Sequence, residues 1–512
     1  MRSYSVFFFL ILYISGCDQR KSSTQHNSVS AVLEEVEQHR PHFHFSPDSM
    51  WMNDPNGMVF YQNIYHLFYQ YYPDSTVWGP MHWGHAISTD MITWEDKPIA
   101  LYPDEHGYIF SGSAVLDVQN TSGFGSKDNP PLVAIYTYHD PEGVQEGKID
   151  YQTQGIAYSM DNGESWTKYD KNPVLKNPGI IDFRDPKIRW FEPANKWIMT
   201  LAVKDHIRFY SSPNLKKWTL ESEFGKDLGA HGGVWECPDL FPLHVVDSNE
   251  ENWILFVSIN PGGPNGGSAT QYFIGDFNGN TFTPLDTEIR WVDYGPDDYA
   301  GVTWSNTGER TLFIGWMSNW NYATIGPTEK WRSAMTIARE LSLNTYHDQL
   351  VLQSIPVPEF DSYITEVFQI QDFVINESIS ISEEASFNSP TFVLDMEIQR
   401  LNDFELILAN DLANEVVLSY EMENSRFLID RSNSGNVSFH PEFGNELVAE
   451  RFLMNSSMNL KLVVDVASLE LFADDGSTVM TAIYFPDEEL DQIEIRSESG
   501  LSVSKLSLKT VK

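Results

Sequence analysis

Short apolar segments recur at regular intervals between residues 50 and 330. In one kind of segment, a short strand and a small residue are followed by a turn and then by a large aromatic residue. This unit occurs at 86–94, 157–166, 209–218 and 273–282. A second kind is strongly apolar and rich in aromatic residues, and it occurs at 65–69, 132–136, 197–201, 253–257 and 311–315. The alternation predicts five cycles of about four short β-strands, separated by turns.

Repeated four-stranded units of this kind are typical of β-propeller blades arranged around a central axis. We therefore expect a five-bladed β-propeller over residues 41–352. A pair of packed β-sandwiches is the alternative fold, and the regularity of the cycle disfavours it.

The last third of the chain has a different composition. All 15 tryptophans lie between Trp51 and Trp331. A proline-containing segment at 353–360 reads as a linker, and runs of alternating polarity follow it, for example at 392–396, 460–465 and 469–473. These runs predict an antiparallel β-sandwich over residues 361–512, without a catalytic cluster of its own. The expected class is thus all-β, with two domains.

The N-terminus has the features of an export signal. Arg2 precedes an apolar stretch at 7–14, which is too short to span a bilayer, and small residues follow it. The sequence Ile-Ser-Gly-Cys at 14–17 resembles a bacterial lipoprotein box, which implies lipidation of Cys17; an ordinary cleaved signal is the alternative. We expect a signal peptide at 1–17, a polar tether at 18–40, and an exported lipoprotein at the cell surface or in the periplasm.

The formal net charge of −39 disfavours binding partners that are themselves negatively charged. Such a surface repels nucleic acid and anionic lipid headgroups, so we expect no nucleic-acid partner and membrane contact only through the lipid anchor. A neutral substrate is compatible with this charge. The two cysteines exclude a disulfide framework, and the oligomeric state remains open.

Three strands predicted to line the propeller axis carry an acid next to a proline. They contain Asp54 within Trp-Met-Asn-Asp-Pro-Asn-Gly at 51–57, Asp185 within Arg-Asp-Pro at 184–186, and Glu236 within Glu-Cys-Pro at 236–238. One Asp-Pro pair is usually a turn. Three acids at equivalent positions in different blades should converge on the axis, and converging carboxyl groups are what glycoside cleavage requires.

These three motifs resemble the signatures of glycoside hydrolase family 32, which contains invertases, inulinases and levanases. The resemblance runs from about residue 40 to the end and implies a five-bladed propeller followed by a β-sandwich. It also implies that Asp54 is the nucleophile, that Asp185 stabilises the transition state, and that Glu236 is the acid and then the base. Because the family retains anomeric configuration, we expect the carboxyl groups of Asp54 and Glu236 ~5–5.5 Å apart.

The resemblance also implies a pocket for a terminal fructose. The residues expected to line it are Trp51, Met52, Asn53, Gln70, Trp78, Phe110, Ser111, Arg184 and Trp316. No cofactor and no metal are expected. His82 and His85 have a spacing that metal ligands can have, but no acidic or cysteine partner is near them in the sequence, so we interpret them as structural.

The function that follows is a retaining, exo-acting β-fructosidase that releases fructose from levan or inulin, with sucrose as a further candidate substrate. Three alternatives remain: a fructosyltransferase, a carbohydrate-binding protein without activity, and an inverting arabinan- or xylan-cleaving propeller enzyme. The seven-residue motif around Asp54 argues against the last of these. The sequence leaves open the preference for β-2,6 or β-2,1 linkages.

Overall fold

The computed structural model describes residues 37–512, and residues 39–512 form one compact unit. The expected signal peptide, the lipidation site Cys17 and most of the expected tether lie outside the described residues. No helix within the described part has the length and apolar character needed to cross a bilayer.

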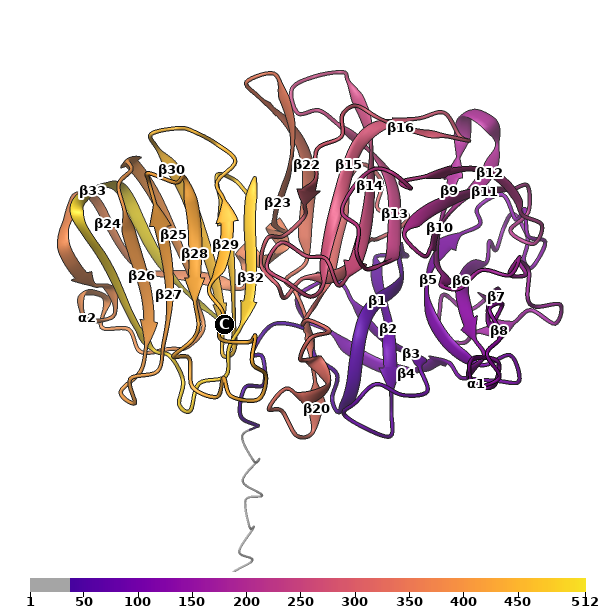
Figure 1. Ribbon diagram of the computed structural model, residues 1–512, viewed down its shortest axis with the longest axis horizontal. Helices are drawn as coiled ribbons and strands as arrows, with labels where there is room; N and C mark the ends of the chain where they lie inside the picture. The colour runs from indigo at the N-terminus through magenta and orange to yellow at the C-terminus, as the bar shows by residue number, and fades with distance from the viewer. Residues whose placement is uncertain (1–36) are drawn as a thin grey trace, which may run out of the picture. The chain divides into compact units, whose positions relative to one another are not determined.

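Five antiparallel sheets follow one another along the chain and form the predicted five-bladed propeller (Figure 1). Blade 1 contains β1 (Met50–Tyr61), β2 (Ile64–Tyr72), β3 (His82–Ser88) and β4 (Glu95–Leu101). Blade 2 contains β5 (Tyr108–Leu116), β6 (Leu132–His139), β7 (Gln152–Ser159) and β8 (Thr167–Lys168), with helix α1 (Pro141–Gln145) between β6 and β7. Blade 3 contains β9 (Phe183–Phe191), β10 (Lys196–Val203), β11 (His206–Ser212) and β12 (Thr219–Phe224), with the 3₁₀ turn η1 (Glu192–Ala194).

The last two blades carry extra short strands. Blade 4 contains β13 (Val234–His244), β14 (Glu251–Asn260), β15 (Ala269–Phe277), β16 (Phe282–Pro284) and β17 (Arg290–Trp291). Blade 5 contains β18 (Tyr299–Thr303), β19 (Leu312–Met317), β21 (Ala334–Met335), β22 (Arg339–Tyr346) and β23 (Gln349–Pro356), with the 3₁₀ turn η2 (Ala323–Ile325). Strand β20 (Trp331–Arg332) leaves blade 5 and pairs in parallel with β1, which links the last blade to the first.

The strongly apolar segments found in the sequence are the second strands of the blades: β2, β6, β10, β14 and β19. Each has a neighbouring strand on both sides, and most of its side chains are buried. The first strands β1, β5, β9, β13 and β18 contact one another from blade to blade and surround the axis. This arrangement places the motifs with the acids at the centre of the propeller.

The C-terminal domain is a sandwich whose two layers are joined by long strands. Its elements are β24 (Ile364–Ser380), α2 (Ile381–Ala385), β25 (Phe392–Arg400), β26 (Phe404–Ala409), β27 (Glu415–Glu421), β28 (Arg426–Asp430), β29 (Leu447–Glu450), β30 (Met458–Asp465), β31 (Ser468–Ala473), β32 (Thr478–Ile483) and β33 (Gln492–Val511). The first part of β33 pairs with β26 and its later part with β25, so one strand takes part in both layers. Aliphatic and aromatic side chains from both layers form one core.

Two boundaries differ from the expectation. Residues 353–356 of the expected linker complete the edge strand β23, where Pro356 is tolerated because no further strand needs its missing amide hydrogen. The 3₁₀ turn η3 (Pro358–Ser362) then leads into β24. At the other end, His39 is buried and the Arg40 guanidinium lies 4.5 Å from the centre of the Trp331 ring, so both belong to the compact unit rather than to the tether.

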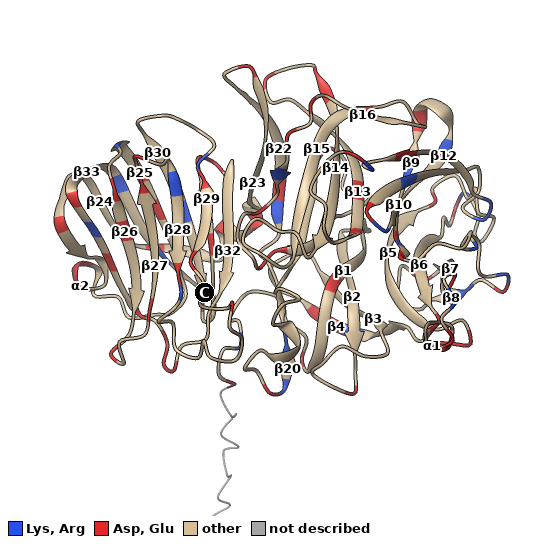
Figure 2. Cartoon of the chain, in the orientation of Figure 1, with Lys and Arg blue, Asp and Glu red and all other residues tan. Residues whose placement is uncertain are grey.

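Acidic residues occur along both domains and are not confined to one element (Figure 2). The negative charge is therefore spread over the chain and not concentrated in one segment.

Candidate active site

The five innermost strands share one irregularity. Each contains a β-bulge in which two residues face a single residue of the second strand. The bulged pairs are Asn53–Asp54, Phe110–Ser111, Asp185–Pro186, Cys237–Pro238 and Ala300–Gly301. A bulge redirects side chains and interrupts ladder pairing, and bulges are common next to active sites. Here the bulges bring candidate residues from all five blades to one level of the axis.

The three acids surround this level but do not occupy one equivalent position. Glu236 immediately precedes its bulge, Asp185 is the first bulged residue, and Asp54 is the second. The acids were expected at equivalent positions of their blades, and this expectation is wrong: relative to the bulge, they occupy three successive positions. The offset lets each carboxyl group approach the axis from a different direction.

Cys237 connects two of the acids. Its Sγ lies 3.4 Å from Asp54 Oδ2 and 3.8 Å from Asp185 Oδ2, and its backbone N–H donates to Asp185 Oδ2 at 3.1 Å. The backbone of Cys237 has a φ of 43° and that of Asp185 a φ of 62°, in the region that residues other than glycine rarely adopt. Such backbone strain is typical of functional sites. The two carboxylates from blades 1 and 3 therefore meet around one thiol from blade 4.

Asp54 is held by donors on both oxygens. The Ser111 hydroxyl donates to Oδ2 at 2.6 Å, and the Asn53 side-chain amide donates to Oδ1 at 2.8 Å. Burial raises the pKa of Asp54, the nearby Glu236 carboxylate adds to the rise, and the hydrogen bonds from Ser111 and Asn53 oppose it. The donors thus favour the ionised form in a site where burial disfavours it.

Asp185 has fewer donors. Burial raises its pKa to about 7, Arg184 opposes the rise, and the carboxylates of Glu236 and Asp54 add to it. Its backbone N–H donates to the Thr137 hydroxyl at 3.0 Å, which fixes the bulge against blade 2.

Glu236 has a different partner on each oxygen. Arg184 donates to Oε1 through Nε at 3.1 Å and through Nη2 at 2.8 Å, while the Tyr299 hydroxyl donates to Oε2. Arg184 also donates to Asp182. The carboxyl group of Glu236 therefore has a defined orientation, set by blades 3 and 5.

Several expected pocket residues contact the acids or border them. Asn53 and Ser111 bind Asp54 directly, and Arg184 binds Glu236. Trp78 is 39% exposed, and its ring lies edge-on to that of Phe110 with 6.0 Å between ring centres. These two aromatic side chains are therefore available at the surface near the Ser111 bulge.

Four other expected pocket residues lie behind the site. Trp51, Met52 and Trp316 are 0% exposed, so they contact neighbouring side chains and present no surface of their own to a sugar. Trp51 instead donates its indole N–H to Asn53 Oδ1 at 2.7 Å and so orients the amide that binds Asp54. Gln70 is also buried.

The amide nitrogen of Gln70 donates to Asn56 Oδ1 at 2.9 Å and to the carbonyl of Ile109 at 3.1 Å. Asn56 in turn donates to the carbonyl of Asp54 at 2.7 Å. Gln70, which faces the bulge of β1, therefore ties the Asp54 strand to β5.

Sequence reasoning gave no role to Cys237, Tyr299 or Thr137, although all three contact the acids. The sequence offered two signals for these residues: Cys237 lies within the Glu-Cys-Pro motif, and Tyr299 directly follows the two acids at 297–298. His82 and His85 each have another hydrogen-bonding partner: His82 Nδ1 lies 2.9 Å from the carbonyl of Pro80, and His85 Nε2 lies 3.1 Å from His66 Nδ1. Within residues 37–512, no group of three or more histidine, cysteine or acidic side chains could hold a metal ion.

Comparisons with known proteins agree with this architecture. Residues 44–354 match the family model of the glycosyl hydrolases family 32 N-terminal domain, and residues 359–511 match that of the family 32 C-terminal domain. A levanase of Bacillus subtilis is 44% identical over 489 residues, which cover 93% of this chain and 71% of the levanase. An extracellular exo-inulinase of Aspergillus niger is 38% identical over 500 residues, covering 90% and 92% of the two chains.

A solved structure gives the same result for the fold. The crystal structure of exo-inulinase from Aspergillus awamori superposes with a TM-score of 0.86 at 35% identity, over 93% of this chain and 99% of that chain. The sequence match to both family models, the shared propeller and sandwich, and the relatives at more than a third identity lead to one conclusion: the chain belongs to glycosyl hydrolase family 32.

Proposed function

We propose that this glycoside hydrolase is an exo-acting β-fructosidase that releases fructose from fructans with retention of configuration. The observation that carries the proposal is the convergence of Asp54, Asp185 and Glu236 on one level of the propeller axis, each with its own set of donors. Relatives named levanase and exo-inulinase support a fructan substrate.

The proposed reaction has two displacements. In the first, an Asp54 oxygen forms a bond to the anomeric carbon of the fructosyl unit, while Glu236 gives its proton to the departing glycosidic oxygen. In the second, Glu236 takes a proton from water, the water oxygen bonds to the anomeric carbon, and the Asp54 carboxylate leaves. Atoms and charge balance, since each displacement breaks one carbon–oxygen bond and forms another.

The surrounding side chains have matching proposed roles. Ser111 and Asn53 hold Asp54 in the orientation for attack, and Arg184 and Tyr299 orient Glu236 toward the leaving oxygen. Asp185 would bind fructose hydroxyl groups and stabilise positive charge at the anomeric carbon in the transition state. Trp78 and Phe110 would border the sugar, and the buried Trp51, Met52, Gln70 and Trp316 would support the pocket from behind.

Exo cleavage predicts a simple product pattern. With levan, inulin and sucrose as separate substrates, fructose should be the dominant early product, because a pocket that accepts one terminal unit releases one unit at a time. Chromatography of samples taken below about a tenth of full conversion measures this. Early mixtures of longer oligosaccharides would show an open cleft and endo cleavage, and growth of longer chains at high sucrose would show transfer.

We also propose that the protein is exported and is anchored as a lipoprotein through Cys17. Related exo-inulinases are named extracellular, which supports export but does not bear on the lipid anchor. Substituting Cys17→Ser should remove the lipid attachment and shift the enzyme from the membrane fraction to the soluble fraction, or leave the precursor unprocessed. Fractionation followed by an activity assay measures the change. Unaltered membrane association of the mature variant would contradict the anchor.

A further inference from the structure

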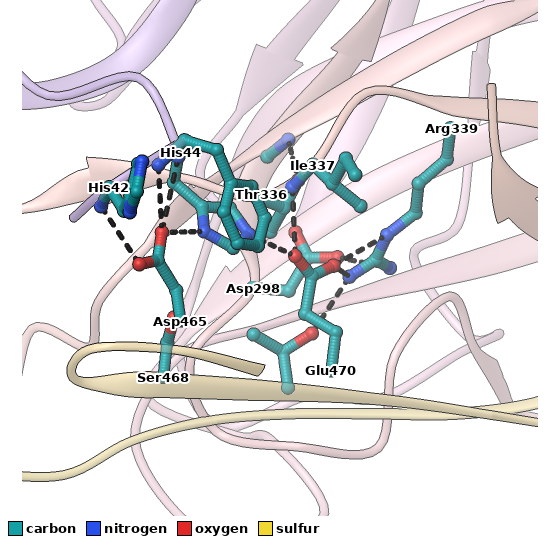
Figure 3. A network of polar contacts seen from close by, with 12 residues as sticks. His42, His44, Asp298, Thr336, Ile337, Arg339, Asp465, Ser468 and Glu470 are labelled. Atoms are coloured by element: carbon teal, nitrogen blue, oxygen red, sulfur yellow. Dashed lines mark hydrogen bonds and ion pairs between the residues drawn. The ribbon is translucent and has the colours of Figure 1, made fainter. Parts of the chain in front are cut away.

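The junction between propeller and sandwich contains a buried guanidinium surrounded by acceptors (Figure 3). Arg339, at the start of β22, is fully buried. Its Nη1 donates at 3.0 Å to both Asp293 Oδ2 and Asp298 Oδ2, and its Nε donates at 3.2 Å to Glu470 Oε2. Its Nη2 donates at 2.7 Å to Thr481 Oγ1. Two acceptors thus come from the propeller and two from sandwich strands β31 and β32.

Glu470 has its own fixed position. Its Oε1 lies 2.7 Å from His44 Nε2 and accepts the backbone N–H of Ile337 at 2.8 Å (Figure 3). His44 Nδ1 in turn lies 2.8 Å from Asp465 Oδ2. Because all of these groups are buried, each depends on its hydrogen-bonding partners for its orientation.

Thr481 of the sandwich contacts the propeller through both its side chain and its backbone. Its hydroxyl accepts from Arg339 and donates to Asp293 Oδ2 at 2.6 Å, while its backbone N–H donates to Asp293 Oδ1 at 2.8 Å. The two backbones are also in close contact: a Cβ on Gly295 would lie 2.0 Å from the carbonyl oxygen of Thr481. The segment 293–298 therefore rests directly on strand β32.

Asp298 lies between this contact and the inner strands of blade 5. Its Oδ2 is bound by Arg339, whereas its buried Oδ1 has no hydrogen-bonding partner and packs against Gly315, whose added Cβ would lie 1.8 Å away. Burial raises the pKa of Asp298 well above its usual range, Arg339 opposes the rise, and Asp293 adds to it. The side chain is wedged between Arg339 and strand β19, with one strong donor.

The next residue is Tyr299, whose hydroxyl donates to Glu236. Tyr299 directly precedes the bulge of β18, where Ala300 has a φ of 53° and two residues face Gly315. A bulge lacks regular ladder pairing, so the direction of the neighbouring side chain depends on what fixes the strand on either side. On the N-terminal side that anchor is Asp298.

We propose that the sandwich helps to position Glu236, although the hydrogen bonds to the three acids described above all come from the propeller. The relay runs from Thr481 through Arg339 to Asp298, and Tyr299 completes it at Glu236. The inference rests on the proposed acid–base role of Glu236 and gives the second domain a part in catalysis, with Tyr299, Asp298, Arg339 and Thr481 as positioning residues.

The test uses matched substitutions on one strand. Thr481 and Thr478 both lie on β32 and are both fully buried, but among the described residues the hydrogen bond of the Thr478 hydroxyl stays within the sandwich, where it accepts from the backbone N–H of Phe452. Thr481→Val should lower kcat on a fructan about tenfold, the scale of one lost hydrogen bond to a charged group. Thr478→Val should leave kcat near that of the unaltered enzyme at a comparable loss of Tm, and Thr481→Ser, which keeps the hydroxyl, should restore kcat.

Substrates with different leaving groups distinguish a positioning effect from a loss of stability. An aryl fructoside needs little help from an acid in the first displacement, so Thr481→Val should slow its initial burst of aryl alcohol less than about twofold. Partial unfolding would instead slow fructan cleavage and this burst equally. In a double-mutant cycle, Tyr299→Phe should remove most of the effect of Thr481→Val, because both act on Glu236 through one relay. If the valine variants are too unstable to purify, Thr481→Ala and Thr478→Ala repeat the comparison.

Equal losses on both substrates, or additive effects in the cycle, would overturn the relay. Failure of the relay can be distinguished from failure of the proposed function. If the proposed function were wrong, the unaltered enzyme itself would release no fructose.

Discussion

Replacing Asp54 by asparagine should abolish fructose release from every substrate, activated or not. The substitution removes the oxygen that forms the covalent bond in the first displacement, and no other described group takes its place. We expect a loss of at least ~10⁴-fold in kcat/KM, or ~5.5 kcal/mol of transition-state stabilisation. Initial rates on a fructan, on sucrose and on an aryl fructoside measure it.

The same variant should be more resistant to heat. Burial raises the pKa of Asp54, so the folded protein binds a proton at this position more readily than the unfolded chain does. At pH values above the folded-state pKa the ionised carboxylate therefore lowers the free energy of unfolding, and this cost decreases as the pH falls from the folded-state pKa toward the lower pKa of the unfolded chain. Asparagine carries no charge and avoids the cost, and the Ser111 hydroxyl can rotate to accept from the new amide.

A raised Tm at pH 7–8 together with lost activity would show that the variant is folded and that its chemistry alone is missing. Asp96→Asn, on the exposed outer strand β4 of the same blade, is the control and should keep full activity. Turnover of Asp54→Asn within tenfold of the unaltered enzyme would exclude Asp54 as the nucleophile.

The propeller could be predicted because its second strands are buried on both sides and therefore read as unbroken apolar runs, such as 253–257. The sandwich strands were visible for a different reason. Strands such as β25 face the core on one side only, and their buried and exposed residues alternate toward the strand end. Strands β31 and β32 are buried on both sides, because their second face packs against the propeller. The long strand β33, which joins the two layers, could not be foreseen, since the change of layer depends on tertiary pairing and not on local polarity.

The three acids could be found from their motifs, but their geometry could not. The one-residue offsets among Glu236, Asp185 and Asp54 come from bulges, and a bulge is defined by the partner strand, which the local sequence does not contain. For the same reason the contacts of Cys237 and Tyr299 were missed. Burial is equally hidden from the local sequence: Trp51 and Trp316 were expected to line the pocket, and both are 0% exposed.

Replacing Glu236 by alanine should affect the two displacements differently, and this difference identifies the acid–base residue. On natural fructans the poor leaving group needs protonation, so we expect a loss of at least ~10²–10⁴-fold. An aryl fructoside departs without that proton, so its first displacement should survive better than the second, and the fructosyl enzyme should accumulate. A burst of aryl alcohol followed by slow turnover measures this. Arg184 keeps its hydrogen bond to Asp182 in the variant, so the guanidinium is not left unpaired.

Azide provides the decisive measurement, because it is a nucleophile that needs no base. Added azide should attack the accumulated intermediate, restore turnover of the aryl substrate and yield a β-fructosyl azide, which nuclear magnetic resonance identifies. Asp185→Ala is the matched control: Asp185 forms and breaks no bond in the proposed reaction, so the variant should lose rate without any rescue by azide. If azide instead restored Asp54 variants, with an inverted product, and left Glu236→Ala inactive, the roles of the two carboxylates would be exchanged. If Glu236→Ala yields a β-fructosyl azide of retained configuration and Asp54→Asn does not respond to azide, the covalent step is assigned to Asp54 and the proton transfers to Glu236.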